Sequence, residues 1–165
     1  MQPFLFLVVL LGVFYSKALA QEDETRNSIL LESVQNGDVD GIDRALQMDE
    51  SIDTINVNGW SAAHFAVQAG NYAILEAVIN RGIDLNLVDD SGNTALMVAA
   101  SHSDLEMVEL MVGANANPLL KSKQGDTAYS LAAKRHRVAL VIAEACAIHA
   151  IERSDTAALL EAIEH

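Results

Sequence analysis

The sequence has few of the residues that most often stiffen a small protein. It contains one cysteine, Cys146, so no disulfide can form within the chain. Only 5% of the residues are aromatic, whereas 51% are hydrophobic and alanine is abundant. This composition suits closely packed helices better than a β-sandwich or barrel. We therefore expect an all-α protein whose fold is held together by packing alone.

Basic residues are also scarce. The chain has 10 Lys and Arg against 23 Asp and Glu, a formal net charge of −13. Such an excess of negative charge argues against a nucleic-acid partner, because binding to the phosphate backbone requires cations. Five of the basic residues lie within residues 121–137, whereas residues 21–56 are strongly acidic. The protein is thus expected to have a negative end and a positive stretch.

The first twenty residues differ from the rest of the chain. Residues 3–15 form an uncharged apolar run, and Ala18-Leu19-Ala20 is an A-x-A cleavage pattern just before an acidic segment. The run is shorter than the roughly 20 residues that span a bilayer, so residues 1–20 are interpreted as a cleaved signal peptide and not as a membrane anchor. Cleavage removes Lys17 and leaves nine basic residues against 23 acidic ones, a net charge of −14.

The expected compartment follows from two absences. The sequence has no N-x-S/T glycosylation site, and no disulfide is possible. An exported domain without either feature is more typical of the bacterial periplasm than of eukaryotic secretion. We predict a periplasmic protein that does not insert into a membrane after cleavage, with secretion as the alternative.

Three segments of the chain align without a gap at a spacing of 33 residues. They are Gly59–Ala66, Gly92–Ala99 and Gly125–Ala132. Each has a hydroxyl residue at its third position, suited to cap a helix, and then apolar residues at helical spacing. One further step towards the N-terminus reaches Ser28, where the pattern continues without its glycine. The pattern predicts about four repeats, each beginning with a short helix.

Turn and stop residues recur in the same register. Gly37 and Gly70 lie where a turn follows the first helix, and Gly82 and Asn115 lie where a second helix ends in a left-handed residue. Apolar residues at helical spacing predict second helices over residues 72–80 and 105–112. The last helical pattern, residues 138–151, continues past the position where a glycine should stop it.

This register resembles the ankyrin repeat, whose signature is G-x-T-P-L-H-x-A followed by a glycine turn, a second helix and G-A-x-x-N. The resemblance covers about residues 27–150. Alanine replaces the signature proline in every repeat, and only His64 keeps the histidine, which in the family bonds the hydroxyl group at the position of Ser61. The resemblance implies an ankyrin-repeat solenoid over residues 21–165, with repeats at about 26–58, 59–91, 92–124 and 125–153 and a C-terminal capping helix at 154–165.

The sequence gives little support for a catalytic or metal-binding function. The five histidines show no i, i+4 pair, which argues against a zinc site. Cys146 and His149 share one helix face, but a packed core cysteine beside a polar neighbour explains them better than a nucleophile and its base. No glycine-rich loop follows a strand pattern. We therefore predict no enzyme activity, no metal and no cofactor, and a chain that is monomeric on its own.

The remaining candidate is a protein-binding surface. In the family, hairpin tips and first helices line a concave groove, and the core leaves their residues free to vary. Trp60, the only tryptophan, is expected at such a tip as a binding anchor, with packing across the base of the neighbouring hairpin as the alternative. The predicted partner-binding residues are Val57, Asn58, Trp60, Gln68, Asp90, Ser91, Asn93, Ser101, His102, Lys123, Gln124, Asp126, Lys134 and Arg135.

The resemblance implies a non-catalytic protein that binds another protein. The chain looks similar to exported bacterial ankyrin-repeat proteins, which implies a periplasmic or cell-wall enzyme as partner. We expect a module that complexes and inhibits such an enzyme, for example a peptidoglycan-cleaving endopeptidase, as self-protection. The alternatives are an accessory protein for a periplasmic catalase and a secreted effector that binds a host protein.

Overall fold

The computed structural model describes residues 28–102, 104–133 and 136–152. The expected signal peptide, 1–20, and the expected capping helix, 154–165, lie outside these residues. Within them, the secondary structure is helical apart from two isolated β-bridges. The helices are α2 (Ile29–Asn36), α3 (Val39–Gln47), α4 (Ala62–Gln68), α5 (Tyr72–Asn80), α6 (Ala95–His102), α7 (Leu105–Gly113), α8 (Ala128–Ala132) and α9 (His136–Glu152).

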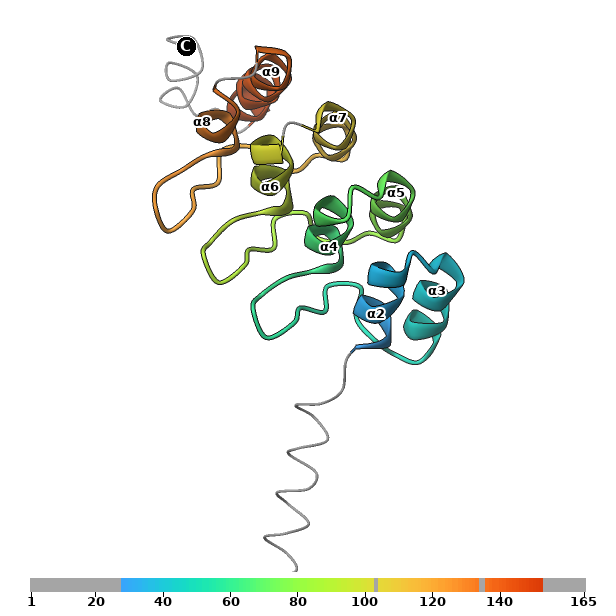
Figure 1. Ribbon diagram of the computed structural model, residues 1–165. Helices are drawn as coiled ribbons and strands as arrows, with labels where there is room; N and C mark the ends of the chain where they lie inside the picture. The colour runs from blue at the N-terminus through green and yellow to red at the C-terminus, as the bar shows by residue number, and fades with distance from the viewer. Residues whose placement is uncertain (1–27, 103, 134–135, 153–165) are drawn as a thin grey trace, which may run out of the picture.

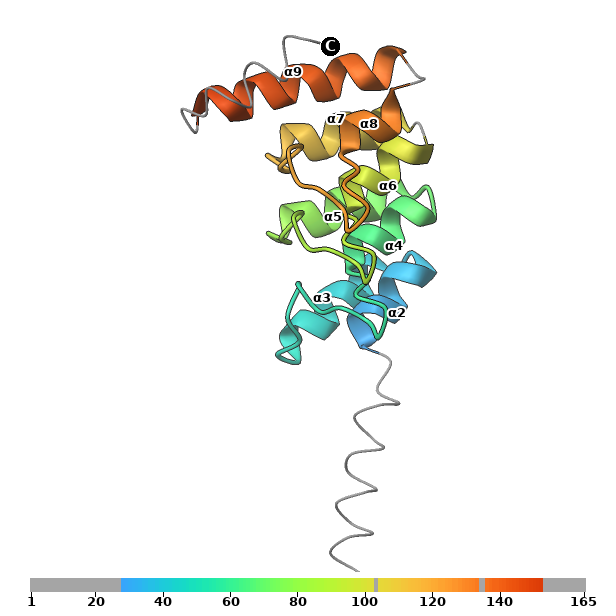
Figure 2. The same ribbon diagram turned by 90° about the vertical axis from the view of Figure 1, so that its left-hand side faces the viewer.

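The helices form two parallel columns. The first helices of the repeats, α2, α4, α6 and α8, make an inner column, and the second helices, α3, α5, α7 and α9, stack beside them as an outer column (Figure 1). Long hairpin loops project from the inner column, on the side away from the outer helices, and lie one above another (Figure 2). This is the all-α solenoid expected from the repeats.

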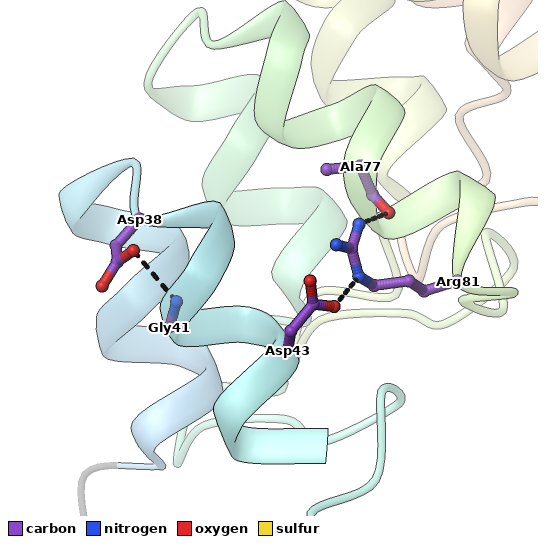
Figure 3. Close-up of polar contacts among 5 residues, drawn as sticks. All are labelled: Asp38, Gly41, Asp43, Ala77 and Arg81. Carbon is purple, nitrogen blue, oxygen red and sulfur yellow. Dashed lines mark hydrogen bonds and ion pairs between the residues drawn. The ribbon is translucent and has the colours of Figure 1, made fainter. Parts of the chain in front are cut away.

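Six of the described helices, α2, α3, α5, α6, α7 and α8, start where a side chain accepts a backbone N–H of the first turn. Among the second helices, Asp38 Oδ1 accepts from Gly41 N at 2.9 Å (Figure 3). Asn71 and Asp104 repeat this cap at 33-residue intervals. Among the first helices, the side-chain oxygens of Ser28, Thr94 and Thr127 accept from Leu31, Met97 and Ser130 at 3.2, 3.3 and 3.1 Å.

The second helices stop at one residue with a positive φ angle. Gly82 has φ 82° and Asn115 has φ 64°, as the sequence predicts. Asp49 occupies the same position in the first repeat, with φ 67°, although the sequence pattern did not single it out. One repeat after Asn115 stands Ile148, a β-branched residue that avoids this conformation. Helix α9 therefore continues to Glu152.

The first repeat lacks the hairpin glycine and closes differently. The Glu50 carboxylate accepts hydrogen bonds from the backbone N–H groups of Ile29 and Leu30 at 3.1 and 3.0 Å, and from the Ser28 hydroxyl at 2.8 Å. These donors lie at the start of α2, where the helix dipole favours a negative charge. The loop after α3 thus folds back and caps the start of α2.

A row of alanines holds the two columns together. Ala66, Ala99 and Ala132 are fully buried in α4, α6 and α8. Their small side chains let neighbouring helices approach closely, and larger side chains such as Leu75 and Met111 of the outer helices complete the core. The expected second helices are confirmed, although α7 ends at Gly113, one residue later than predicted.

Candidate protein-binding surface

Each of the three hairpins is closed by one acceptor side chain. Asn56 Oδ1 accepts from the backbone N–H groups of Asn58 and Trp60, both at 2.9 Å. The backbone carbonyl of Asn56 also accepts from Gly59 N at 3.0 Å. The same side-chain arrangement recurs 33 and 66 residues later, with Asp89 Oδ1 accepting from Ser91 and Asn93 at 2.8 Å, and Ser122 Oγ accepting from Gln124 and Asp126 at 3.3 and 3.2 Å.

The hairpins are also bonded to one another. Asp90 N donates to the carbonyl of Asn58 at 3.0 Å, and Lys123 N donates to the carbonyl of Ser91 at 3.0 Å. The ammonium group of Lys123 donates to the Asp90 carbonyl at 2.7 Å. Residues 55–61, 88–94 and 121–127, which we call the hairpin row, therefore form one connected surface.

Six of the predicted binding residues lie at the tips of this row. Val57 is 88% exposed, and its neighbours at the three tips are exposed or half-buried. Apart from Lys123, whose ammonium group donates to the Asp90 carbonyl, these residues enter the hydrogen bonds of the hairpins through backbone groups, so their side chains are not needed for the core. The six tip residues are Val57, Asn58, Asp90, Ser91, Lys123 and Gln124.

The sequence-based placement of Trp60 at a hairpin tip is wrong. Trp60 lies on the returning limb of its hairpin, as Asn93 and Asp126 do in theirs, and its carbonyl accepts from Asn56 N at 3.0 Å. Its ring packs edge-on against Phe65, with 5.3 Å between centroids. The half-buried indole thus packs on the helix of its own repeat. Its position within reach of the tips leaves a binding role open as a prediction.

Three further predicted residues lie at the other end of the first helices. Gln68 ends α4, Ser101 and His102 end α6, and all three side chains are exposed. Gln68 and His102 line an open depression of about 680 Å³ between these helix ends. The length of a short helix, about 10 Å for seven residues, separates them from the hairpin row. Lys134 and Arg135 lie outside the described residues.

Sequence reasoning missed two apolar side chains on the hairpin row. Ile55 is 50% exposed and Val88 is 47% exposed. They stand at the same repeat position, where each pairs across its hairpin with Ser61 or Thr94. The sequence signal that could have found them is a β-branched residue that recurs after 33 residues, at a position that the core does not use. One repeat later this position holds the exposed Lys121, so the row runs from apolar to basic.

The buried ring of His64 holds the start of α4. Its Nδ1 accepts from Ser61 N at 3.3 Å and lies 2.9 Å from the Ser61 hydroxyl, while Nε2 lies 3.0 Å from the carbonyl of Asn93. A carbonyl can only accept, so Nε2 carries a proton, whereas Nδ1 accepts from Ser61 N and carries none; the ring is therefore neutral. Burial lowers the pKa of His64 below its usual 6.5, against opposing contributions from the Asn93 carbonyl and the Asp89 carboxylate. His64 is a structural residue, as expected.

No three His, Cys, Asp or Glu side chains of the described ranges are grouped so that they could hold a metal ion. Cys146 is buried in α9, and burial raises the pKa of its thiol to about 11. In the part of the chain that the structure describes, no helix combines the length and apolar character needed to cross a membrane.

The comparison with known families agrees with this architecture. A family model described as "Ankyrin repeats (3 copies)" matches residues 30–122 and 82–152, which together make up more than half of the chain. The chain belongs to the ankyrin-repeat family. Members of this family are generally interaction modules without catalysis, so the hairpin row is a candidate surface for a protein partner.

Similar proteins come from distant sources. The chain is 26% identical to protein phosphatase 1 regulatory subunit 27 of Mus musculus over 99 residues, 59% of this chain and 64% of that protein. It is 26% identical to human transient receptor potential cation channel subfamily A member 1 over 110 residues, 66% of this chain and 10% of the channel subunit. An ankyrin repeat-containing protein of Treponema pallidum is 33% identical over 73 residues, 44% of this chain and 24% of that protein. The chain spans less than two thirds of each of these relatives.

Proposed function

We propose that this ankyrin-repeat protein acts in the periplasm, where it complexes and inhibits a partner enzyme such as a peptidoglycan-cleaving endopeptidase. The observation that carries the binding part of the proposal is the hairpin row. Its tips are exposed, yet its backbone is held by hydrogen bonds within and between hairpins. A preorganised surface loses little conformational entropy when a partner binds.

The character of the row suggests how a partner would be held. Ile55, Val57 and Val88 offer exposed apolar side chains at one end, and Lys121 and Lys123 offer cations at the other. Side chains that become fully desolvated at the centre of an interface supply most of the affinity, whereas rim charges mainly steer association. We infer a partner surface that pairs an apolar patch with a nearby acidic one.

Two features support inhibition of an enzyme in the periplasm. The N-terminal segment reads as a signal peptide, with the A-x-A pattern at Ala18-Leu19-Ala20. The mouse relative is, by its name, a regulatory subunit of an enzyme, a phosphatase. A rigid module of stacked repeats suits a stoichiometric inhibitor that protects the cell in which it is made.

The first experiment identifies the partner. The purified protein is immobilised and used to capture proteins from periplasmic extract, and the captured enzyme is then assayed for cell-wall cleavage with and without the protein. Inhibition at a one-to-one ratio supports the proposal. Capture of a catalase whose activity rises would favour the accessory role, and recovery of the protein in the medium would favour a secreted effector.

The second experiment tests the surface. Val57→Asp is expected to raise the Kd for the captured partner about tenfold or more, since it puts a charge into the apolar end of the row. Lys123→Glu is expected mainly to slow association and to reduce its dependence on salt. Leu140→Asp, at a 69% exposed position of α9, is the matched control and should bind normally. Normal binding by all three variants would show that the hairpin row is not the interface.

A further inference from the structure

Two neighbouring pairs of outer helices are joined in different ways. Between α3 and α5, Arg81 Nε donates to Asp43 Oδ1 at 2.6 Å, and Arg81 Nη1 donates to the carbonyl of Ala77 at 2.7 Å (Figure 3). The guanidinium group thus lies between a carboxylate of one helix and the last turn of the next. Pairing with Arg81 lowers the pKa of Asp43 below its ordinary value.

One repeat later the cation is missing. The residue 33 positions after Arg81 is Ala114, and the residue 33 positions after Asp43 is Glu76. The backbone is the same, because Arg81 has φ −94° and ψ 4° after α5, and Ala114 has φ −89° and ψ 15° after α7. The carboxylate is therefore retained in the α5–α7 pair, while its internal partner has been replaced by a methyl group.

An open groove of about 630 Å³ lies between α5 and α7. The two helices that line it, α5 and α7, belong to the outer column, away from the hairpins (Figure 1). Within the described ranges, no Lys, Arg or His forms an ion pair with Glu76, Glu106 or Glu109. The groove is lined by the apolar or uncharged residues Tyr72, Ile79, Leu110, Gly113 and Ala114, and by the carboxylates Glu106 and Glu109.

We propose that the α5–α7 groove binds an arginine side chain of another protein. The arginine would lay its aliphatic stem on Ile79 and Leu110 and place its guanidinium group beside the carboxylates of Glu106 and Glu109, which line the same groove. Charge complementarity selects this occupant, because the groove and the protein, with net charge −13, are both negative. The groove shares no lining residue with the hairpin row, so this proposal does not depend on that surface.

A pair of peptides tests the proposal directly. Fluorescein-labelled Ala-Leu-Arg-Leu-Ala with blocked ends is titrated with the purified protein by fluorescence anisotropy, beside the same peptide containing uncharged citrulline. The arginine peptide is expected to bind at least about fivefold more tightly, and to lose this advantage at high salt. Equal affinity of the two peptides would overturn the proposal.

Variants of the protein locate the site. Ala114→Arg restores the internal cation and should abolish binding of the arginine peptide. Glu106→Gln with Glu109→Gln should weaken that binding about fivefold, whereas Glu32→Gln, at an exposed position of α2, should leave it unchanged. Unchanged binding by the double glutamine variant, with circular dichroism as for the wild type, would refute the site even if Ala114→Arg failed to fold.

A second copy of the chain is the competing occupant, since Arg137 and Leu140 are both exposed on α9. Sedimentation velocity of the protein alone separates the two cases. Concentration-dependent self-association that Ala114→Arg abolishes would assign the groove to a second copy and overturn the proposal of a different protein. A monomer at all concentrations, together with selective binding of the arginine peptide, supports it.

Discussion

Gly92 leaves the space in which the backbone of Lys123 approaches the preceding hairpin. A Cβ atom on Gly92 would lie 2.9 Å from the backbone nitrogen of Lys123, closer than such atoms come in proteins. The adjacent hydrogen bond from Lys123 N to the carbonyl of Ser91 measures 3.0 Å. Gly92 is thus needed for the contact between hairpins as well as for the conformation of its own turn.

This relationship predicts unequal effects of one substitution at two equivalent sites. Gly92 and Gly125 have φ angles of 79° and 87°, so alanine should cost about 1 kcal/mol or more at either position. Only Gly92→Ala adds a clash, since no atom lies within 4 Å of a Cβ on Gly125. Urea unfolding should therefore show Gly92→Ala to be the less stable variant. Equal losses would mean that the stacking of the hairpins contributes nothing.

Acid should weaken the contact between the second and third repeats through His64. Because burial holds the pKa of His64 below the usual 6.5, the unfolded chain binds this proton first as pH falls. Above pH 6.5 the neutral His64 ring makes its full contribution to the free energy of unfolding. Below pH 6.5 this contribution declines by at most about 1.4 kcal/mol per pH unit, until the folded-state pKa is reached. Melting temperatures between pH 7.5 and pH 5 measure this dependence.

Two variants isolate the contribution of His64. His64→Gln should lower the melting temperature at pH 7.5 but reduce its further fall on acidification, because the titrating ring is gone. His102→Gln changes an exposed histidine and should keep the wild-type dependence on pH. A His64→Gln curve parallel to that of the wild type would show that other groups, and not this ring, set the acid response.

Overpacking of the inner column should be costly. Ala99 is fully buried in α6, and Ala99→Leu adds three methylene-sized groups where none fits, so a loss of about 1 to 3 kcal/mol is expected in urea unfolding. Ala73→Leu, at an exposed position of α5, is the control with the same chemical change and should alter stability little. An unchanged free energy of unfolding for Ala99→Leu would contradict the close approach of the helices.

Cys146 should be unreactive in the folded protein. The thiolate is the reactive form, and a pKa of about 11 leaves little of it at pH 8. Labelling with Ellman's reagent at pH 8 should be at least about a hundredfold slower than in urea, where the pKa returns to roughly 8.5. Rapid labelling under native conditions would show that α9 opens readily.

The melting transition should be cooperative and should not respond to reductant or to EDTA. One cysteine cannot form an internal bridge, and the described residues offer no metal-binding group. Circular dichroism at 222 nm during heating, with and without each reagent, measures the transition. A large drop in melting temperature with EDTA would reveal a metal bound by residues outside the described ranges.

Much of the fold could be predicted because the deciding signals are local. Gly82 and Asn115 end helices through their own backbone preference, and Thr94 and Thr127 cap helices through bonds to residues three positions away. Asp49 was missed because aspartate tolerates the left-handed conformation without requiring it. The position of Trp60 was missed because a 33-residue pattern does not say on which limb of a hairpin a ring will find a neighbour.

The sequence by itself determined the repeat length, the order of helices and the small residues between them. These features depend on helical periodicity, caps and backbone preferences within a few residues. Only the tertiary structure decided that Arg81 pairs with Asp43, that His64 reaches Asn93, and that the hairpins bond to one another. Such contacts join residues about 30 to 40 positions apart, whose distances depend on how the repeats stack. The open groove between α5 and α7 also follows from that stacking. Ala114 leaves empty the place that Arg81 fills one repeat before, and only the stacked structure shows that the two places are equivalent.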